Sequence, residues 1–527
     1  MLRWIAVAAL VVVAAASAFL AVLHPWWWLL TAPLLALALL GVHDLVQRRH
    51  SILRNYPVLG HMRFALESIR PELQQYFIER NYDGRPFDRD TRNVIYERAK
   101  GIHGEQAFGT ERDVNQVGYE YLLHSTRPLP QADMPPRVRV GGPDCTQPYD
   151  MALLNVSAMS FGALSGNAIR ALNMGAALGG FAHDTGEGGL TDHHLEHGGD
   201  LVWELGSGYF GARTKDGDFD PDMFRDKAAH ESVKMVSLKL SQGAKPGIGG
   251  VLPAAKVSRE IASARGVPVG EKCVSPPYHR VFSTPRELVL FLARMRELAA
   301  GKPTGFKLCV GSRVEFLGIC KAMVEEGVTP DFIVVDGSEG GTGAAPLEFE
   351  DHIGVPLTEG LLFVHNALVG AGLRRHVKIG ASGKVATGTD IVKRLVQGAD
   401  YANAARAMMM AVGCIQAQRC HTNTCPVGVT TQDPRRARAL VVPDKAERVH
   451  RFQDGTVTQA LQIISAMGLR SPSELQPHML QRRVDHVTTQ GYDELYDWLT
   501  PGELLYGAKE PWSKDWDRAD PDDFVPL

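Results

Sequence analysis

The stretch "GFKLCVGSRVEFLGICKAMVEEGVTPDFIVVDGS", residues 305–338, carries the pattern that predicts the fold class. Two short apolar runs within it, 305–311 and 332–338, are typical of buried strands. Residues 313–328, which lie between them, have the apolar spacing of a helix. A strand, a helix and a second strand in this order predict two parallel strands joined by a helical crossover.

The same alternation of strands and helices continues on both sides of this stretch. Helical patterns occur at 285–301, 313–328 and 388–399. The strand candidates are 151–159, 179–186, 236–241, 271–276, 305–311, 332–338, 376–382 and 401–407. Eight candidates within about 260 residues predict an α/β fold, a (β/α)8 TIM barrel. An open doubly wound sheet is the alternative, but "GGTGAAP" (340–346) lacks the G-x-G-x-x-G fingerprint of such sheets.

The N-terminus carries two long apolar runs, 4–23 and 26–42. Each has about the length that crosses a bilayer, so we expect a transmembrane helical hairpin that turns at His24-Pro25. Arg48, Arg49 and Arg54 follow the second run and predict a catalytic domain on the cytoplasmic side of the inner (plasma) membrane. A cleaved signal peptide ending near "AAASA" (14–18) is the alternative, although the first run is long for a signal peptide.

The composition suggests a globular body without a nucleic-acid partner. The chain has 527 residues, a formal net charge of −3 and no large block of Lys or Arg. We expect four regions: the hairpin at 1–45, a helical linker and cap at 46–145, the barrel at 146–435 and a small helical extension at 436–527.

In a TIM barrel the residues just past the carboxyl ends of the strands form the active site. Here those positions are rich in Gly, small polar residues and Lys. They are 157–160, 184–189, 242–250, Lys307, 337–343, 382–384 and 405–406. Such loops let backbone N–H groups approach the phosphate or ring oxygens of a cofactor. Glycines that merely end strands are the alternative for any single loop.

Three of the seven cysteines, Cys414, Cys420 and Cys425, lie within twelve positions of one another. They are compatible with buried small residues, a metal site or a redox pair. Zinc would require a fourth ligand, for which His421 is the nearby candidate.

Six short strings stand in a characteristic order. They are "SAMSFGALS" (157–165), "DTGEGG" (184–189), "QGAKPGIGG" (242–250), "VSPPYH" (274–279), "GGTGAAP" (340–346) and "CIQAQRCHTNTCPVGV" (414–429). Together they resemble the FMN-binding synthase domain of glutamate synthase over about residues 125–435. The resemblance implies an FMN-binding barrel and a 3Fe-4S cluster held by Cys414, Cys420 and Cys425 in the spacing C-x5-C-x4-C.

The resemblance also implies which residues hold FMN. They are Ser157, Ala158, Met159, Gln242, Lys307, Ser382, Gly383, Lys384, Ala405 and Arg406. The first three would lie along the flavin ring, Gln242 at its polar edge, and the last five at the phosphate. Lys307 would lie near the ring, where a cation stabilises reduced flavin. A structural salt bridge is the alternative role for Lys307.

By the same resemblance, Glu187 and Lys245 are the candidate catalytic residues. The candidate substrate-binding residues are Lys245, Arg265, Gly340 and Gly341. Ile248 and Val251 depart from the Glu and Gln of the family's substrate loop, and that Gln normally contacts 2-oxoglutarate. The substrate is therefore expected to be a 2-oxo acid, with 2-oxoglutarate ranked narrowly first.

The expected function is reductive amination of this acid to an amino acid, by FMN and the iron–sulfur cluster. No NAD(P) fingerprint or amidotransferase segment is recognised in the sequence, so a separate donor protein, a ferredoxin or a reductase subunit, is expected to supply electrons. The alternative is a membrane-anchored flavoprotein that exchanges electrons with the quinone pool and acts on another small acid or amine. A membrane scaffold with an inactive barrel is a third, non-enzyme interpretation.

Overall fold

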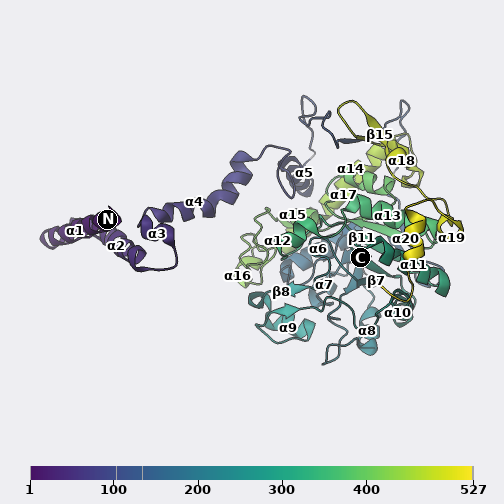
Figure 1. Ribbon diagram of the computed structural model, residues 1–527, viewed down its shortest axis with the longest axis horizontal. Helices are drawn as coiled ribbons and strands as arrows, with labels where there is room; N and C mark the ends of the chain where they lie inside the picture. Colours follow the sequence, from purple (N-terminus) through teal and green to yellow (C-terminus); the bar gives the residue numbers. More distant parts are fainter. Residues whose placement is uncertain (1, 103, 133, 525–527) are drawn as a thin grey trace. The chain divides into compact units, whose positions relative to one another are not determined.

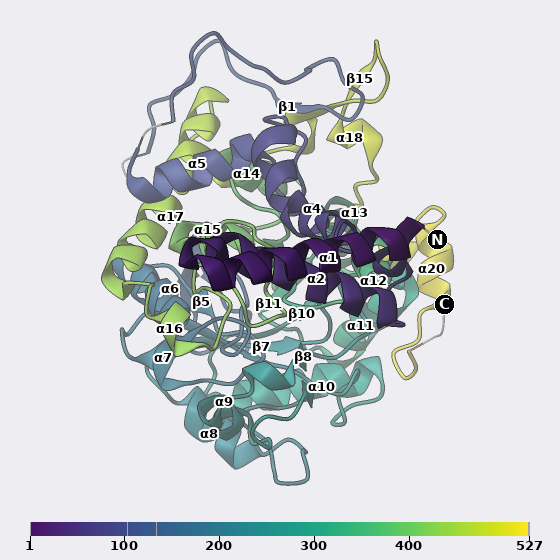
Figure 2. The same ribbon diagram turned by 90° about the vertical axis from the view of Figure 1, so that its left-hand side faces the viewer.

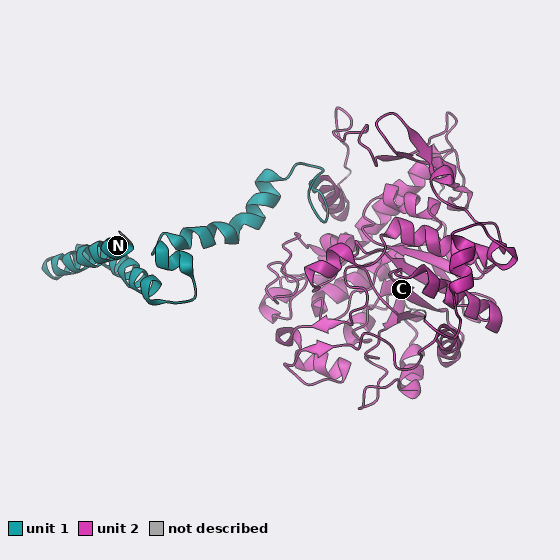
Figure 3. Ribbon diagram, in the orientation of Figure 1, with its two compact units in different colours: residues 1–89 teal, residues 90–527 magenta. Residues whose placement is uncertain are grey.

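The structure is a computed structural model that describes the chain except residues 1, 103, 133 and 525–527. It divides into two units, Met1–Arg89 and Asp90–Leu527, which Figure 3 shows in different colours. The barrel and every predicted site residue lie in the second unit.

The first unit consists of helices (Figure 1). They are α1 (Leu2–Leu23), η1 (Pro25–Trp27), α2 (Trp28–Val46), α3 (Ser51–Asn55), α4 (Gly60–Leu73) and η2 (Gln74–Ile78). Helices α1 and α2 pack against each other, and the short η1 connects them. Both are long and apolar enough to cross a membrane, over Arg3–Leu23 and Pro25–Val46, by length and composition alone.

Eight parallel strands of the second unit close into a barrel, which confirms the predicted fold class. The strands in chain order are β4 (Leu154–Val156), β5 (His183–Asp184), β6 (Leu201–Leu205), β7 (Val233–Lys239), β10 (Thr304–Leu308), β11 (Phe332–Asp336), β12 (Lys378–Ser382) and β13 (Tyr401–Ala404). Each strand pairs with its neighbours in chain order, and β13 closes the barrel on β4.

One predicted barrel strand is wrong. Residues 271–276 contain β9 (Cys273–Val274), which pairs antiparallel with β8 (Val251–Leu252) in a separate two-stranded sheet. The third place in the barrel belongs instead to β6, "LVWEL", which the sequence analysis did not select. Every residue of β6 is buried, although the run contains Glu204. A search for uninterrupted apolar runs does not find this strand, because a glutamate lies within it.

Helices follow most of the barrel strands. They are α6 (Gly166–Gly179), α7 (Asp192–Leu195), α8 (Pro221–Ala228), η3 (Ala254–Lys256), α9 (Arg259–Arg265), α10 (Pro285–Leu298), α11 (Arg313–Glu326), α12 (Leu347–His352), α13 (Leu357–Gly370), α14 (Gly388–Val396) and α15 (Arg406–Val412). Thr284, Ser312 and Thr387 cap α10, α11 and α14, where each side-chain oxygen accepts a backbone N–H. These caps explain why the three helical patterns in the sequence begin where they do.

The chain on either side of the barrel adds further elements. They are α5 (Arg89–Lys100), β1 (Glu120–Leu122), β2 (Val138–Val140), β3 (Tyr149–Met151), α16 (Pro434–Ala437), α17 (Val442–Ala466), η4 (Pro472–Glu474), η5 (Pro477–Met479), β14 (Leu480–Arg483), β15 (Thr489–Gly491), α18 (Tyr492–Leu495), α19 (Glu503–Tyr506) and α20 (Trp512–Arg518). Helix α17 packs on α6, and Arg98 of α5 donates to Thr456 of α17 at 3.2 Å (Figure 2). Strand β1 joins β14 and β15 in one sheet. Segments before and after the barrel therefore pack together on its side.

Candidate active site

A buried ion pair joins predicted site residues at the mouth of the barrel. Lys239 is the last residue of β7, and its Nζ lies 2.8 Å from Glu187 Oε1. The same Nζ donates to Gln242 Oε1 at 2.5 Å. The structure therefore brings Glu187 and Gln242 together through a lysine that the sequence analysis missed. The position of this lysine inside the apolar run 236–241 could have marked it as a site residue.

Neighbouring cations control the ionisation of Glu187. Burial alone would raise the pKa of this carboxyl. Lys239 opposes burial most strongly, Lys245 and Arg265 act in the same direction, and the pKa of the carboxyl falls to about 2. Burial also lowers the pKa of Lys245 to about 8, against the opposing attraction of Glu187. Near neutral pH the carboxylate is therefore ionised, and Lys245 is close to the point at which it exchanges its proton.

Arg265 reaches this group from the end of α9. Its Nη2 donates to the carbonyl oxygen of Phe161 at 3.0 Å, and its guanidinium lies 5.0 Å from the centre of the Phe210 ring. The side chain is buried and interacts electrostatically with both Glu187 and Lys245. The substrate-binding candidates Lys245 and Arg265 thus lie in one charged group, the mouth cluster, made of Glu187, Lys239, Lys245 and Arg265.

The mouth cluster is not electrically balanced. Its three cations surround one ionised carboxylate, so two positive charges remain without a carboxylate from within the cluster. A buried charge is costly unless it is paired. The arrangement therefore favours an incoming anion, and a molecule with two carboxylates would balance the charge.

Glycines let the surrounding loops approach the mouth cluster closely. A Cβ on Gly250 would lie 2.3 Å from Glu187 Oε1, and a Cβ on Gly243 would lie 1.9 Å from the carbonyl oxygen of Gly337. The loop 242–250 therefore packs against both Glu187 and the loop after β11. Gly340 lies in that second loop, whereas a Cβ on Gly341 would meet the Arg406 side chain. The proposed substrate contacts of these two glycines stay predictions.

Candidate FMN residues from three strands meet beside this cluster. Ser157 follows β4, and its hydroxyl lies 3.1 Å from that of Ser382 at the end of β12. The Ser157 backbone N–H donates to the carbonyl of Ala404, the last residue of β13. A Cβ on Gly186 would lie 2.6 Å from the backbone nitrogen of Ser160, so the loop 184–189 packs directly on the segment that holds Ala158 and Met159.

The candidate phosphate site lies at the ends of β12 and β13, which pair through Ser382 and Asn403. Gly383 and Lys384 follow β12 with φ angles of 150° and 50°, so two consecutive residues adopt positive φ. Ala405 precedes α15, and Arg406 begins it. Arg406 Nη2 donates to the carbonyl oxygen of Glu339 at 2.6 Å, and burial lowers the pKa of its guanidinium. Two cations beside a tight turn fit a phosphate group.

Lys307 lies in a second buried charged group, the interior cluster, made of Asp184, Glu204 and Lys307. Its Nζ forms an ion pair with Glu204 of β6. Burial lowers the pKa of Lys307, but Glu204 and Asp184 outweigh burial and raise it. Burial, and then Glu204, raise the pKa of Asp184 to about 8. The structure therefore shows the salt bridge that was the alternative role for Lys307, while its contact with flavin stays a prediction.

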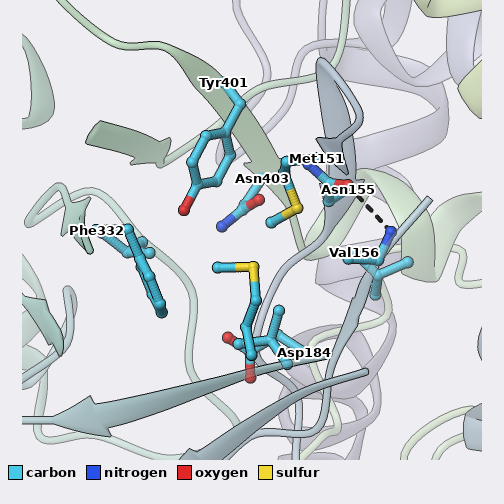
Figure 4. A pocket seen from close by; sticks show the side chains of 11 residues that line it. Met151, Asn155, Val156, Asp184, Phe332, Tyr401 and Asn403 are labelled. Carbon is cyan, nitrogen blue, oxygen red and sulfur yellow. Dashed lines mark hydrogen bonds between the residues drawn. The ribbon is translucent and has the colours of Figure 1, made fainter. Parts of the chain in front are cut away.

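Asp184 also lines a small cavity inside the barrel (Figure 4). The cavity has a volume of about 10 Å³, enough for about one water molecule. Tyr401 and Asn403 face it, and in the described part of the chain the Tyr401 hydroxyl and Asn403 Oδ1 have no hydrogen-bond partner. The rest of the lining is mostly apolar and belongs to the hydrophobic core, so Asp184, Asn155, Tyr401 and Asn403 are the polar residues of a largely apolar interior.

The three candidate cluster cysteines lie in one loop after α15. Burial, helped by the neighbouring Cys420 and Cys425, raises the pKa of Cys414 to about 12. The buried Lys256 interacts with the last two and donates to the carbonyl oxygen of Ala163 at 3.1 Å. Within the residues that the structure describes, no group of three or more His, Cys, Asp or Glu side chains is arranged to hold a metal ion. The structure therefore does not support the predicted 3Fe-4S cluster.

Comparisons with known proteins identify the family. Residues 147–470 match a family described as a conserved region in glutamate synthase. The chain is 36% identical to the glutamate synthase large subunit-like protein YerD of Bacillus subtilis, over 87% of this chain and 94% of that protein. It is 33% identical to the archaeal glutamate synthase [NADPH] of Archaeoglobus fulgidus, over 62% of this chain and 61% of that protein.

Among solved structures, the flavin-binding domain of baker's yeast flavocytochrome b2 superposes with a TM-score of 0.42 at 14% identity, over 86% of this chain and 91% of that chain. The chain spans nearly all of YerD and about three fifths of the archaeal enzyme. The similarity in sequence to these proteins shows the family. The expected oxidoreductase acting on CH–NH2 donors is confirmed at the level of the family. The chain belongs to the glutamate synthase family.

Proposed function

We propose that this protein is an FMN-dependent oxidoreductase that reductively aminates a 2-oxo acid, with 2-oxoglutarate as the first candidate. The observation that carries the proposal is the mouth cluster, in which three buried cations surround one carboxylate. The name of the Archaeoglobus fulgidus relative, a glutamate synthase, supports the same chemistry. A dicarboxylate such as 2-oxoglutarate would supply the two negative charges that the cluster lacks.

The proposed carboxylate contacts are to Lys245 and Arg265. Arg265 is held by the Phe161 carbonyl and the Phe210 ring, so its position is fixed before a ligand arrives. Val251, one of the two residues that depart from the family's substrate loop, lies in β8 opposite Val274 and is partly buried. A valine in this strand offers no hydrogen bond from its side chain, which favours a substrate with an apolar section near the loop.

Lys245 is the proposed proton donor. Its pKa of about 8 allows it to be protonated near neutral pH and to give the proton to the imino nitrogen as hydride adds to the neighbouring carbon. Glu187 cannot take this role because it has a pKa of about 2 and is already ionised. Its proposed role is to hold Lys239 and Lys245 in place. We expect turnover to fall as the pH rises above about 8, because Lys245 then loses its proton.

FMN is proposed to bind along Ser157, Ala158 and Met159, with its phosphate between Lys384 and Arg406. The hydroxyl pair Ser157–Ser382 and the consecutive positive φ angles at 383 and 384 support this placement. When bound and reduced by the electron donor, FMN would supply the hydride that reduces the imino carbon. The residues of the chain orient the acid, exclude water from the buried mouth and move the proton.

The electron donor is proposed to be a separate protein, a ferredoxin or a reductase subunit. The iron–sulfur cluster stays a prediction that depends on cysteine spacing and on the family resemblance. Cys420→Ser should lower the iron content of the purified protein, measured by elemental analysis, and Cys145→Ser is the matched control. Equal iron in Cys420→Ser and the unaltered protein would remove the cluster from the proposal.

The membrane attachment is proposed to run through α1 and α2. Their length and apolar composition support it, and Arg48 and Arg49 after α2 favour a cytoplasmic barrel on the inner membrane. Carbonate extraction of membranes should leave the full chain in the pellet. Release of the full chain into the supernatant would count against an anchor.

The function is tested by reducing the purified full-length protein without oxygen and following flavin absorbance. Addition of 2-oxoglutarate with ammonia should reoxidise the flavin faster than pyruvate with ammonia. Ammonia alone is the control. If no 2-oxo acid reoxidises the flavin while a soluble quinone does, the quinone-linked alternative replaces the proposal. A protein purified without any flavin would contradict both.

A further inference from the structure

Helix α4 and the turn η2 that continues it carry an exposed apolar face. Met62, Leu66, Ile69, Leu73 and Phe77 recur every three or four residues, so they share one side of the helix. We call these five residues the apolar stripe. Their side chains are between 40% and 82% exposed, although they belong to residue types that are usually buried. An exposed apolar surface of this length is typical of a binding face.

The remaining surface of α4 is mostly polar, apart from Phe64, whose ring lies edge-on to that of His50. Arg63 and Glu67 form an i,i+4 ion pair at 2.8 Å, and both are more than half exposed. Ser68 lies on the side away from the apolar stripe, and its hydroxyl donates to the carbonyl of Ala65 within the helix. The helix is therefore amphipathic, with one apolar side and one charged side, rather than apolar all around as α1 and α2 are.

The beginning of α4 is tied to the end of α2. Asp44 lies two residues before the end of α2 and is fully buried. One of its oxygens accepts the backbone N–H of Val58 at 2.8 Å, and the other lies 3.0 Å from His61 Nε2. The first turn of α4 is thereby held beside the last turn of the second apolar helix. Arg48, Arg49 and Arg54 lie between the two helices in the sequence.

We infer that α4 and η2 lie along the membrane surface, with the apolar stripe inserted at the boundary between lipid headgroups and acyl chains. The inference depends on the proposed membrane attachment of α1 and α2. The Asp44 contacts fix the first turn of α4 where the second span would leave the bilayer, so a lipid surface is the nearest apolar partner. The three arginines suit the anionic headgroups at that level. An amphipathic helix of low mean hydropathy is the kind that lies in this plane.

The test uses a photoreactive benzophenone amino acid in the full-length protein in native membranes. It is placed at Leu66 on the apolar stripe, at Ser68 on the polar side, and at Val12, an exposed residue of α1. After irradiation, mass spectrometry identifies the crosslinked partner. We expect lipid adducts at Val12 and Leu66, with at least about fivefold less lipid adduct at Ser68.

The possible outcomes separate the inference from the proposal on which it depends. Lipid adducts at Val12 with none in excess at Leu66 over Ser68 would overturn the inference alone. Crosslinks from Leu66 to a second copy of the chain, or to the Asp90–Leu527 unit, would also overturn it and would name the true partner. The absence of lipid adducts at both Val12 and Leu66 would show that the membrane attachment itself fails. Ile69→Glu, introduced together with the Leu66 label, should lower the lipid adduct severalfold.

Discussion

Two buried charged groups lie in the same barrel and differ in how their charge is balanced. In the interior cluster, Lys307 pairs with Glu204, and the remaining carboxyl of Asp184 has a pKa of about 8 and so keeps its proton near neutral pH. In the mouth cluster, Glu187 is ionised and faces more cations than it can neutralise. The interior cluster is complete without a ligand, whereas the mouth cluster is not.

The difference separates a structural role from a binding role. A buried charge that loses its partner costs several kcal/mol, so each member of the balanced cluster stabilises the fold through its partner. The three cations of the mouth cluster repel one another when no anion is present, because Lys245 interacts with both Lys239 and Arg265. Substitutions in the interior should therefore affect stability, and substitutions at the mouth should affect substrate binding and turnover.

The largest expected effect on stability comes from Lys307→Met. It leaves Glu204 buried and without its cation, which should lower the free energy of unfolding by about 3–5 kcal/mol. Denaturant titration of the purified protein measures the loss. Glu204→Leu added to Lys307→Met should restore much of the stability, since no charge is then left without a partner. A Lys307→Met protein as stable as the unaltered one would contradict the structural role.

The next effect is on turnover. Lys245→Ala should lower turnover of the best 2-oxo acid by well over tenfold, because the substrate carboxylate then loses one partner of a buried charge pair, about 3–5 kcal/mol. The stability of the ligand-free protein should change little, because repulsion of Lys245 by Lys239 and Arg265 opposes its attraction to Glu187. Lys215→Ala, at an exposed lysine, is the control and should change neither property. Normal turnover in Lys245→Ala would remove it from the site.

The smallest expected effect is a change in pH dependence at Asp184. The folded protein keeps a proton on this carboxyl up to about pH 8, whereas the ordinary pKa of a free aspartate side chain is 3.8. The stabilising contribution is therefore complete at low pH and is lost as the pH rises from about 4 through 8. Asp184→Asn should remove this dependence, a difference in slope of about 1 kcal/mol per pH unit. Denaturant midpoints between about pH 6 and 7 measure it, and parallel slopes in both proteins would contradict it.

The sequence predicted the barrel because seven of its strands lie within short apolar runs, most of which end in Gly or Ser. The eighth, β6, was missed because Glu204 lies within it, and that glutamate is the partner of Lys307. Lys239 was missed as a site residue for the same reason, since it is a charged residue within a strand. Both are charged residues whose burial is tolerated only because a distant segment supplies the opposite charge. Sequence spacing does not show such pairings.

The sequence indicated which loops lie at the mouth of the barrel, but not which side chains contact one another there. The glycine-rich strings led to Glu187 and Lys245, and the family resemblance led to Arg265; the structure brings the three into one cluster. The cysteine motif led to an iron–sulfur site that the described residues do not support, so the cluster stays a prediction. A loop motif specifies which residues are close in the sequence, but only the packing of other segments fixes the distances between side chains.

The central claim is that the mouth cluster requires a dianionic ligand. The most direct measurement is the thermal shift of the oxidised full-length protein with 2-oxoglutarate, compared with its dimethyl ester, which has the same carbon skeleton and no charge. We expect a saturable rise in the unfolding temperature with 2-oxoglutarate, a much smaller rise with the ester, and loss of the difference in Lys245→Ala. Equal shifts with the acid and the ester, or no shift with either, would contradict the claim.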